Sequence, residues 1–285
     1  MTDRQILEVR TAQPSRDGDG VAIQRISGMR HAGMDPILLI DELQSDRRED
    51  FAGGFPPHPH RGMQTLTYMK NGGICHEDSE GNRGEIRGGG AQWMSAGRGV
   101  IHSEMPTQDS RGLHGFQLWI NLPAAEKMSP PRYRDIPAEE LARAGGEGFT
   151  VTVIAGDWRV AGLETSGPLQ ELAPRAGIAD LVLQPGAELD LETAPAESVM
   201  AYVYTGALLH GETGVGSHQL AVSGGGERWT LRAGEVGAGV LLLRGHPVGE
   251  PVANYGPFVM NTAEEIDQAI RDYQSGNFAQ SGSHA

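Results

Sequence analysis

Cysteine is almost absent from this sequence: Cys75 is the only one in 285 residues. No intrachain disulfide can therefore form, and a metal site built from several thiolates of one chain is excluded. A reducing compartment is compatible with this composition. We expect Cys75 to be an inert thiol, because His76 is its only neighbour in sequence that could lower its pKa.

Long apolar runs and excess positive charge are also missing. No stretch approaches 18 apolar residues, and the N-terminal MTDRQILEVR has no apolar signal-peptide region, so we expect a cytoplasmic protein that does not enter membranes. The chain has 23 basic and 37 acidic residues and a net charge of -14. Phosphate backbones would repel it, so we expect no direct nucleic-acid binding and interpret Arg83 and Arg87 as part of a solvated loop.

Glycine and proline are abundant, with 41 and 17 residues, and helix-forming residues are not grouped into long periodic runs. Short apolar runs alternate with turn signals, which favours an all-β fold. Residues 63–69 (MQTLTYM) alternate with a period of two and stop at Asn71-Gly72-Gly73, which is typical of a strand before a tight turn. A short helix is expected at 136–146, with Pro137 in its first turn and Gly145 as its stop.

A second helix is expected near the C-terminus, where capping and spacing signals agree. Thr262 is the expected N-cap, Glu265 completes a capping box, and Gly276 is the expected stop. The apolar side chains at helical spacing are Ile266, Ala269, Ile270 and Tyr273. We expect this helix to contribute packing and not function.

The pair Pro130-Pro131 and the short helix after it indicate a boundary between two domains. We expect an N-terminal domain of residues 1–137 and a C-terminal domain of residues 138–285. The strand pattern of the first half repeats in the second with different chemistry.

Two pairs of metal-type ligands stand out in the first half: His58 with His60 in FPPHPHRG, and His102 with Glu104 in AGRGVIHSE. Members of each pair are two residues apart, which on a β-strand places both side chains on one face. With ten histidines in the chain, one such pair is a weak signal, but two pairs in a strand-rich stretch predict a four-ligand site for a transition metal. A loose alignment of the two halves leaves at most Glu192 and His246 as ligands in the second, so we expect no metal there.

Other candidates have competing explanations. Trp93 and Met94 lie between the two ligand pairs and could line a pocket for an aromatic substrate, although barrel core is the favoured explanation. His76, Glu77 and Asp78 form a second polar cluster. Because consecutive strand residues alternate between faces, we expect these three not to converge and to lie at a pocket rim.

Several long motifs resemble the pirin family, a branch of the bicupins: HPHRGMQTLTYMKNGG, HEDSEGNRG, AQWMSAGRGVIHSEMP, LHGFQLWINLP and EPVANYGPFVMNTAEEI. The resemblance implies two tandem cupin (jelly-roll-like) β-barrels with a metal only in the first. It implies His58, His60, His102 and Glu104 as ligands and Fe(II) as the metal, although Ni, Cu, Co, Mn or Zn would suit the same donors. Gln64 departs from the wider cupin pattern, which commonly has a Glu ligand there.

The same resemblance implies two kinds of function. One is a quercetin 2,3-dioxygenase, which cleaves the ring of a small aromatic or enolic substrate with O2 and releases carbon monoxide. Glu104 would then be the general base that takes the proton of the enol. The alternative is a metal-containing regulatory or redox-sensing protein that contacts transcription factors or metabolic enzymes.

Overall fold

The computed structural model describes residues 1–211 and 213–279 of the chain. The expected all-β class is confirmed, because these residues form 24 strands, three short 3-10 turns and one α-helix. They divide into two compact units. The N-terminal unit comprises Pro14–Arg30, Ile37–Ala138 and the chain from Val248, and the C-terminal unit comprises Met1–Gln13, His31–Pro36 and Glu139–Pro247. One boundary between the units, at Ala138 and Glu139, lies next to the expected domain boundary. At the two ends of the chain the units differ from the expected domains, because Met1–Gln13 belongs to the C-terminal unit and the chain from Val248 belongs to the N-terminal unit. A division into domains 1–137 and 138–285 stays a prediction.

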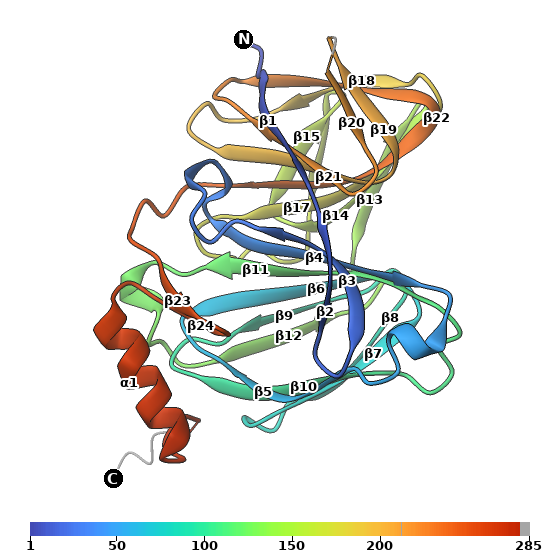
Figure 1. Cartoon of the computed structure of the whole chain (residues 1–285). Coiled ribbons are helices and arrows are strands. Elements are labelled where there is room, and N and C mark those ends of the chain that lie inside the picture. The colour runs from blue at the N-terminus through green and yellow to red at the C-terminus, as the bar shows by residue number, and fades with distance from the viewer. Residues whose placement is uncertain (212, 280–285) are drawn as a thin grey trace. The chain divides into compact units, whose positions relative to one another are not determined.

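Two sheets face each other in the N-terminal unit (Figure 1). The larger sheet has the order β12 (Arg132–Ile136), β9 (Ala91–Ser95), β6 (Met63–Asn71), β11 (Leu113–Asn121), β4 (Ile37–Ser45), β3 (Val21–Ser27) and β2 (Gln13–Asp17). The smaller sheet has the order β5 (Phe55–His60), β10 (Val100–Pro106), β7 (Gly73–Asp78) and β8 (Arg83–Arg87). Short 3-10 turns, η2 (Arg48–Asp50) and η3 (Ala124–Glu126), lie in the connections.

Polar side chains fill much of the space between these two sheets. Thr67 on β6 donates a hydrogen bond to Glu104 on β10, at 3.0 Å between oxygens, and so links the sheets directly. One of the apolar clusters in this unit is formed by Val21, Ile23, Leu43, Phe51, Met69, Ile74, Ile86 and Leu113. Because buried polar groups are costly unless paired, the polar remainder of this interior indicates a functional site.

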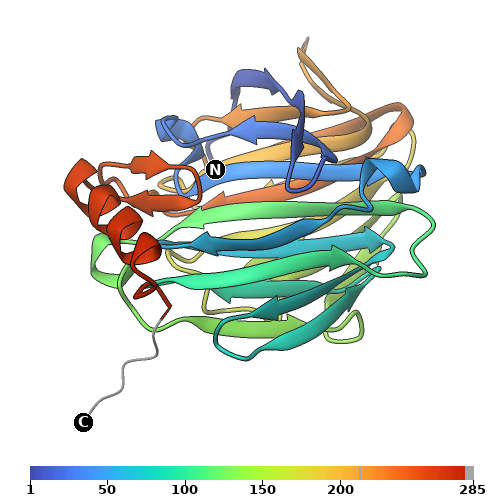
Figure 2. The same ribbon diagram turned by 60° about the horizontal axis from the view of Figure 1, so that its bottom comes forward.

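The expected C-terminal helix is confirmed as α1 (Ala263–Gln274), with the predicted capping box between Thr262 and Glu265 and with Ile266 and Ala269 buried. It packs beside a two-stranded hairpin of β23 (Ala253–Tyr255) and β24 (Phe258–Met260), as Figure 2 shows. Among the described residues, no helix combines the length and apolar composition needed to cross a bilayer.

A glycine lets this C-terminal hairpin approach the first histidine pair. Gly62 has a φ of +77°, and a Cβ atom there would lie 2.1 Å from the carbonyl oxygen of Val259 on β24. Any side chain at position 62 would therefore push β24 away from β5.

The C-terminal unit is a single sheet folded around an apolar core. Its main path runs β1 (Ile6–Thr11), β21 (Gln219–Ser223), β19 (Ser198–His210), β22 (Arg228–Gly245), β17 (Gly177–Leu183), β14 (Phe149–Ala155) and β13 (Ala142–Gly146). The strands off this path are β15 (Asp157–Val160), β16 (Leu163–Ser166), β18 (Glu188–Glu192) and β20 (Thr213–Gly216), and η1 (Ala32–Met34) is a 3-10 turn. Its core consists of aliphatic and aromatic side chains such as Val153, Leu181 and Trp229.

The short helix expected at 136–146 is wrong. Residues Ala142–Gly146 form β13, which pairs antiparallel with β14 from Ala142 opposite Val153 to Gly146 opposite Phe149. A helix of about three turns that ends in two glycines has little intrinsic stability, and the hydrogen bonds of the sheet outweigh it.

The fold makes one prediction about a buried cation. The ammonium group of Lys127 donates to the carbonyl oxygens of Gly62 and Val259 and to the side-chain oxygen of Asn121, at 2.8 to 3.0 Å. Lys127→Met should lower the free energy of unfolding by about 3 kcal/mol or more, because three buried acceptors lose their donor. Chemical denaturation followed by circular dichroism measures this loss.

The matched control is Arg83→Met, at a cation whose side chain is 78% exposed. It should leave the denaturation midpoint almost unchanged. Equal losses in the two variants would contradict the assigned role of Lys127.

Candidate metal centre

Antiparallel pairing of β5 with β10 brings three histidines together. His58 lies directly opposite His102 in the register, and His60 follows on the same face of β5. The ring centroids of His58 and His102 are 4.4 Å apart, those of His58 and His60 4.9 Å, and those of His60 and His102 5.0 Å. One donor atom from each ring lies within 4.8 Å of the other two.

The hydrogen bonds of these rings leave nitrogen atoms available to a metal. His58 Nδ1 lies 2.8 Å from the carbonyl oxygen of Pro56 and donates to it, which leaves the lone pair on Nε2. His60 Nδ1 and His102 Nε2 are buried and have no hydrogen-bond partner. Unsatisfied buried polar atoms are rare in folded proteins, so these two fit a site that is completed by an ion.

Burial also selects the protonation state that a metal requires. The side chains of His60 and His102 are only 1% and 2% exposed. Removal from water holds the pKa of His60 well below its usual range, and the nearby His58 acts in the same direction. Burial likewise lowers the pKa of His102, aided by His60 and His58. Both rings are therefore neutral at pH 7, as metal ligation needs.

Glu104, the predicted fourth ligand, does not join the group of three histidines. Its donor oxygen groups instead with His102 and His76. The register of β10 against β5 shifts after His102, so Glu104 pairs with Phe55 and not with Pro56. A bulge of this kind turns a side chain to a new direction, and the carboxylate here accepts hydrogen bonds from Thr67, at 3.0 Å, and Gln117, at 3.3 Å. Glu104 as a ligand stays a prediction.

The expectation that His76, Glu77 and Asp78 do not converge is wrong for two of the three. His76 and Asp78 share one face of β7, and their side chains are each 1% exposed, whereas Glu77 points away and pairs with Arg83. The signal was the two-residue spacing of His76 and Asp78, which is the same spacing as in the predicted ligand pairs.

A cavity of about 440 Å³ adjoins the histidine group. It is lined by Asp17, Gly18, Arg25, Ser27, Met29, Leu39, Asp41, Leu43, Phe55, Pro56, His58, His60, Glu104, Gln117, Trp119, Asn254, Gly256 and Pro257. Half of these residues are polar or charged and the others are apolar, aromatic or glycine, so the cavity offers both apolar surface and hydrogen-bonding groups to a small organic ligand. All of these residues belong to the N-terminal unit.

One charged group in this cavity has no clear signal in the sequence. Arg25 on β3 pairs with Asp41 on β4 through two hydrogen bonds and with Asp17 through a third. The hydrogen bonds and charge of Asp41 raise the pKa of Arg25, so the guanidinium stays charged. Asp17 and Arg25 are eight residues apart and Asp41 is sixteen further along the chain. The pairing of β3 with β4 places Arg25 opposite Asp41, and β2, which ends at Asp17, is the neighbour of β3 in the same sheet.

Trp93 and Met94 are not among the residues that line the cavity. Trp93 is 3% exposed and donates its indole N–H to Gln64, at 3.0 Å, while Met94 packs with Ala96 and Val100. This placement agrees with barrel core and gives no support to substrate contact. Burial raises the pKa of the Cys75 thiol, and Glu85 adds to the effect, which agrees with an inert thiol.

The C-terminal unit has no corresponding donor group among its described residues. Glu192, one of the two candidate ligands there, accepts a hydrogen bond from Arg159 at 3.0 Å. The backbone of His246 donates to the carbonyl oxygen of Pro174. The apolar core of this unit contains neither side chain.

Comparison with known proteins gives consistent matches over nearly the whole chain. Residues 21–120 match the family model described as Pirin, and residues 178–279 match the Pirin C-terminal cupin domain. A Vibrio cholerae protein provisionally named quercetin 2,3-dioxygenase is 49% identical, over 97% of this chain and 98% of its own. Human Pirin is 36% identical, over 91% and 88%. The crystal structure of a quercetin 2,3-dioxygenase from Acinetobacter baumannii superimposes with a TM-score of 0.88 at 31% identity and covers 97% of this chain and 99% of its own.

The site predicts a specific loss of metal. His102→Ala should reduce metal content at least tenfold, because it removes the imidazole that faces both His58 and His60. Elemental analysis of protein loaded with a stoichiometric divalent metal measures the loss. His246→Ala is the matched control and should retain the metal; full occupancy in His102→Ala would refute the ligand assignment.

The lowered pKa values of His60 and His102 also predict how stability depends on pH in the metal-free protein. Below about pH 6.5 the unfolded chain takes up protons on these two histidines while the folded chain does not. Stability should therefore fall as the pH decreases, with a slope that approaches the limit of about 1.4 kcal/mol per pH unit for each histidine only well below pH 6.5. Denaturant unfolding between pH 7 and 5 measures this slope.

The double variant His60→Gln with His102→Gln is the control, and its slope should be clearly shallower. Identical slopes in the two proteins would contradict the assignment of these neutral histidines.

Proposed function

The chain belongs to the pirin family, and on that premise we propose that it is a metal-dependent dioxygenase that opens the ring of flavonols such as quercetin with O2. The observation that carries the proposal is the pair of buried nitrogens without partners, His60 Nδ1 and His102 Nε2, beside a cavity of about 440 Å³. The site can thus hold an ion and admit an aromatic molecule next to it. The similarity to proteins named as quercetin 2,3-dioxygenases supports this reaction.

We propose that His58, His60, His102 and Glu104 hold one divalent transition metal. Imidazole and carboxylate donors suit Fe(II), and Ni, Cu, Co, Mn or Zn share the same preference, so availability decides among them. When bound, the ion supplies a Lewis acid for an enolic oxygen and a centre that reacts with O2.

Glu104 is the proposed general base. It is 4% exposed and borders the cavity, so its carboxylate can take the proton of a flavonol hydroxyl that enters there. The hydrogen bonds from Thr67 and Gln117 hold the carboxylate in place. Opening of the ring inserts both atoms of O2 into the products and releases one carbon as carbon monoxide.

The cavity walls supply orientation and exclude water. Trp119, whose ring lies 5.2 Å from that of His60, and Phe55 offer aromatic surface for a flat ring system. The guanidinium group of Arg25 can donate hydrogen bonds to ring hydroxyl groups, and the carboxylates of Asp17 and Asp41 can accept them. Substrates with several hydroxyl groups are therefore favoured over plain hydrocarbons.

The proposal predicts oxygen consumption that depends on both the metal and the enolic hydroxyl. The Fe(II)-loaded protein should consume O2 with quercetin and release carbon monoxide, and it should be inactive with luteolin, which lacks the 3-hydroxyl group. An oxygen electrode combined with detection of carbon monoxide measures both effects.

Glu104→Gln tests the base in the same assay. It should lower kcat by about 100-fold or more in protein that still contains metal. A fully metal-loaded wild-type protein that consumes no oxygen with a panel of enolic aromatics would overturn the enzymatic proposal and favour the regulatory alternative.

A further inference from the structure

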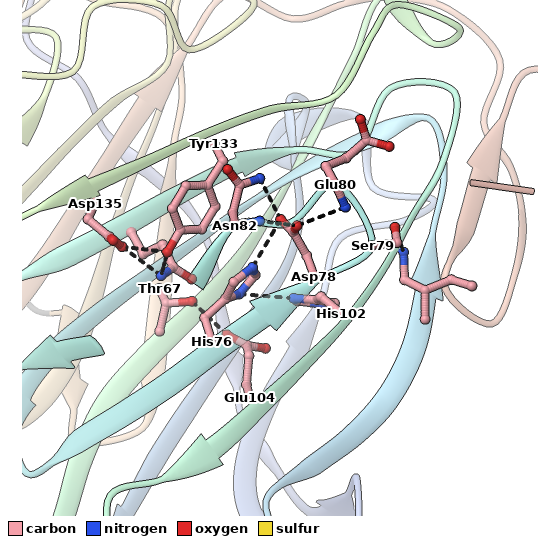
Figure 3. Close-up of polar contacts among 12 residues, drawn as sticks. Thr67, His76, Asp78, Ser79, Glu80, Asn82, His102, Glu104, Tyr133 and Asp135 are labelled. Atoms are coloured by element: carbon pink, nitrogen blue, oxygen red, sulfur yellow. Dashed lines mark hydrogen bonds and ion pairs between the residues drawn. The ribbon is translucent and has the colours of Figure 1, made fainter. Parts of the chain in front are cut away.

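His76 and Asp78 lie directly behind the proposed metal ligands without belonging to them. Strand β7 pairs with β10 so that Asp78 is opposite His102 and His76 is opposite Glu104. Figure 3 shows both side chains on the inner face of β7, with the His76 ring between Asp78 and His102.

Two hydrogen bonds connect these side chains into a chain. His76 Nε2 lies 3.3 Å from the Oδ2 atom of Asp78, and His76 Nδ1 lies 3.3 Å from His102 Nδ1. The Asp78 carboxylate also accepts three hydrogen bonds from its own loop: from the backbone N–H of Glu80, from the backbone N–H of Asn82 and from the Asn82 side-chain amide, at 2.8 to 3.0 Å. A carboxylate so surrounded by donors acts only as an acceptor.

The proton positions along the chain follow from this acceptor. His76 must carry its proton on Nε2 to donate to Asp78, which leaves a lone pair on Nδ1. His102 must then carry its proton on Nδ1 to donate to His76, which leaves the lone pair on Nε2. That atom is the buried nitrogen of His102 that has no partner.

Packing fixes the orientation of His76. The Tyr133 ring lies 4.9 Å from the His76 ring, and the His102 ring lies 5.0 Å from it. Tyr133 donates its hydroxyl proton to Asp135 at 2.7 Å, and Gln92 donates to both groups, so the tyrosine is itself held in place. His76 therefore has little freedom to rotate away from His102.

We propose that Asp78 and His76 are positioning residues that fix the tautomer of His102, aim its Nε2 atom at the proposed metal and strengthen it as an electron donor. The inference rests on the metal site of the proposed function. Partners of this kind typically change metal affinity by about 10- to 100-fold.

The competing explanation is a second metal position between His76, His102 and Glu104, whose donor atoms also lie within 4.8 Å of one another. It is disfavoured because the two Nδ1 atoms already form a hydrogen bond.

The test uses cobalt(II) as a probe in the full-length protein. Asp78→Asn and His76→Phe should each weaken cobalt binding by about 10- to 100-fold, measured by competition with a chelator. Both should alter the visible absorption bands of bound cobalt and raise the Fe(III)/Fe(II) potential, because His102 becomes a weaker donor.

His76→Gln keeps an acceptor for His102 Nδ1 and should therefore bind cobalt more tightly than His76→Phe does. The double variant Asp78→Asn with His76→Phe should bind no more weakly than His76→Phe alone, because both changes break one chain.

Glu77→Gln is the matched control, since it removes a carboxylate from the opposite face of the same strand, where the side chain is 57% exposed. It should bind cobalt as the wild type does. Unchanged affinity, spectrum and potential in Asp78→Asn, the nearly isosteric change, would overturn the inference even if His76→Phe does not fold.

A wild-type protein with two bound cobalt ions, one of which is lost in His76→Phe, would also overturn the inference in favour of a second metal position. Failure of the wild type to bind any cobalt would overturn the metal site and the positioning role together. Tight binding by the wild type and by all variants would overturn the positioning role alone.

Discussion

The antiparallel pairing of β5 with β10 is the constraint on which the site depends. It places His58 opposite His102, and the period of two along β5 adds His60 to the same group. Strand pairing fixes backbone positions through many hydrogen bonds, so the three imidazoles come together without relying on flexible loops. The bulge after His102 then turns Glu104 toward Thr67 and Gln117, so that a carboxylate lies at the edge of the cavity beside the histidines.

The interiors of the two units differ in their content of buried polar side chains. The C-terminal unit fills its core with aliphatic and aromatic side chains, whose burial is the main favourable contribution to its folding. The N-terminal unit buries His60, His76, His102 and Glu104 in addition to its apolar residues, at a cost in desolvation that hydrogen bonds only partly offset. One nitrogen of His60 and one of His102 remain without a hydrogen-bond partner, which is the arrangement expected where an ion completes the structure.

Local patterns in the sequence were sufficient for the fold class, the C-terminal helix and the three histidines, because each depends on spacing within one strand or helix. The prediction of a helix at 136–146 was wrong because the pairing of Ala142–Gly146 with β14 decides the structure there. Local helix propensity does not contain this information. The direction of Glu104 depends on a bulge, and the Arg25–Asp41 pair depends on cross-strand register; neither leaves a trace in residue spacing. The two-residue spacing of His76 and Asp78 was sufficient to predict that both side chains lie on one face of a strand. Glu77 between them lies on the other face, so the three residues do not act as one cluster.

Anomalous X-ray scattering from crystals of the metal-loaded protein, recorded at the absorption edge of the bound metal, locates the ion directly. One strong peak is expected in the N-terminal unit, within about 2.3 Å of a nitrogen from each of His58, His60 and His102. A peak between His76 and His102, or one that contacts fewer than three of these imidazoles, would contradict the ligand assignment.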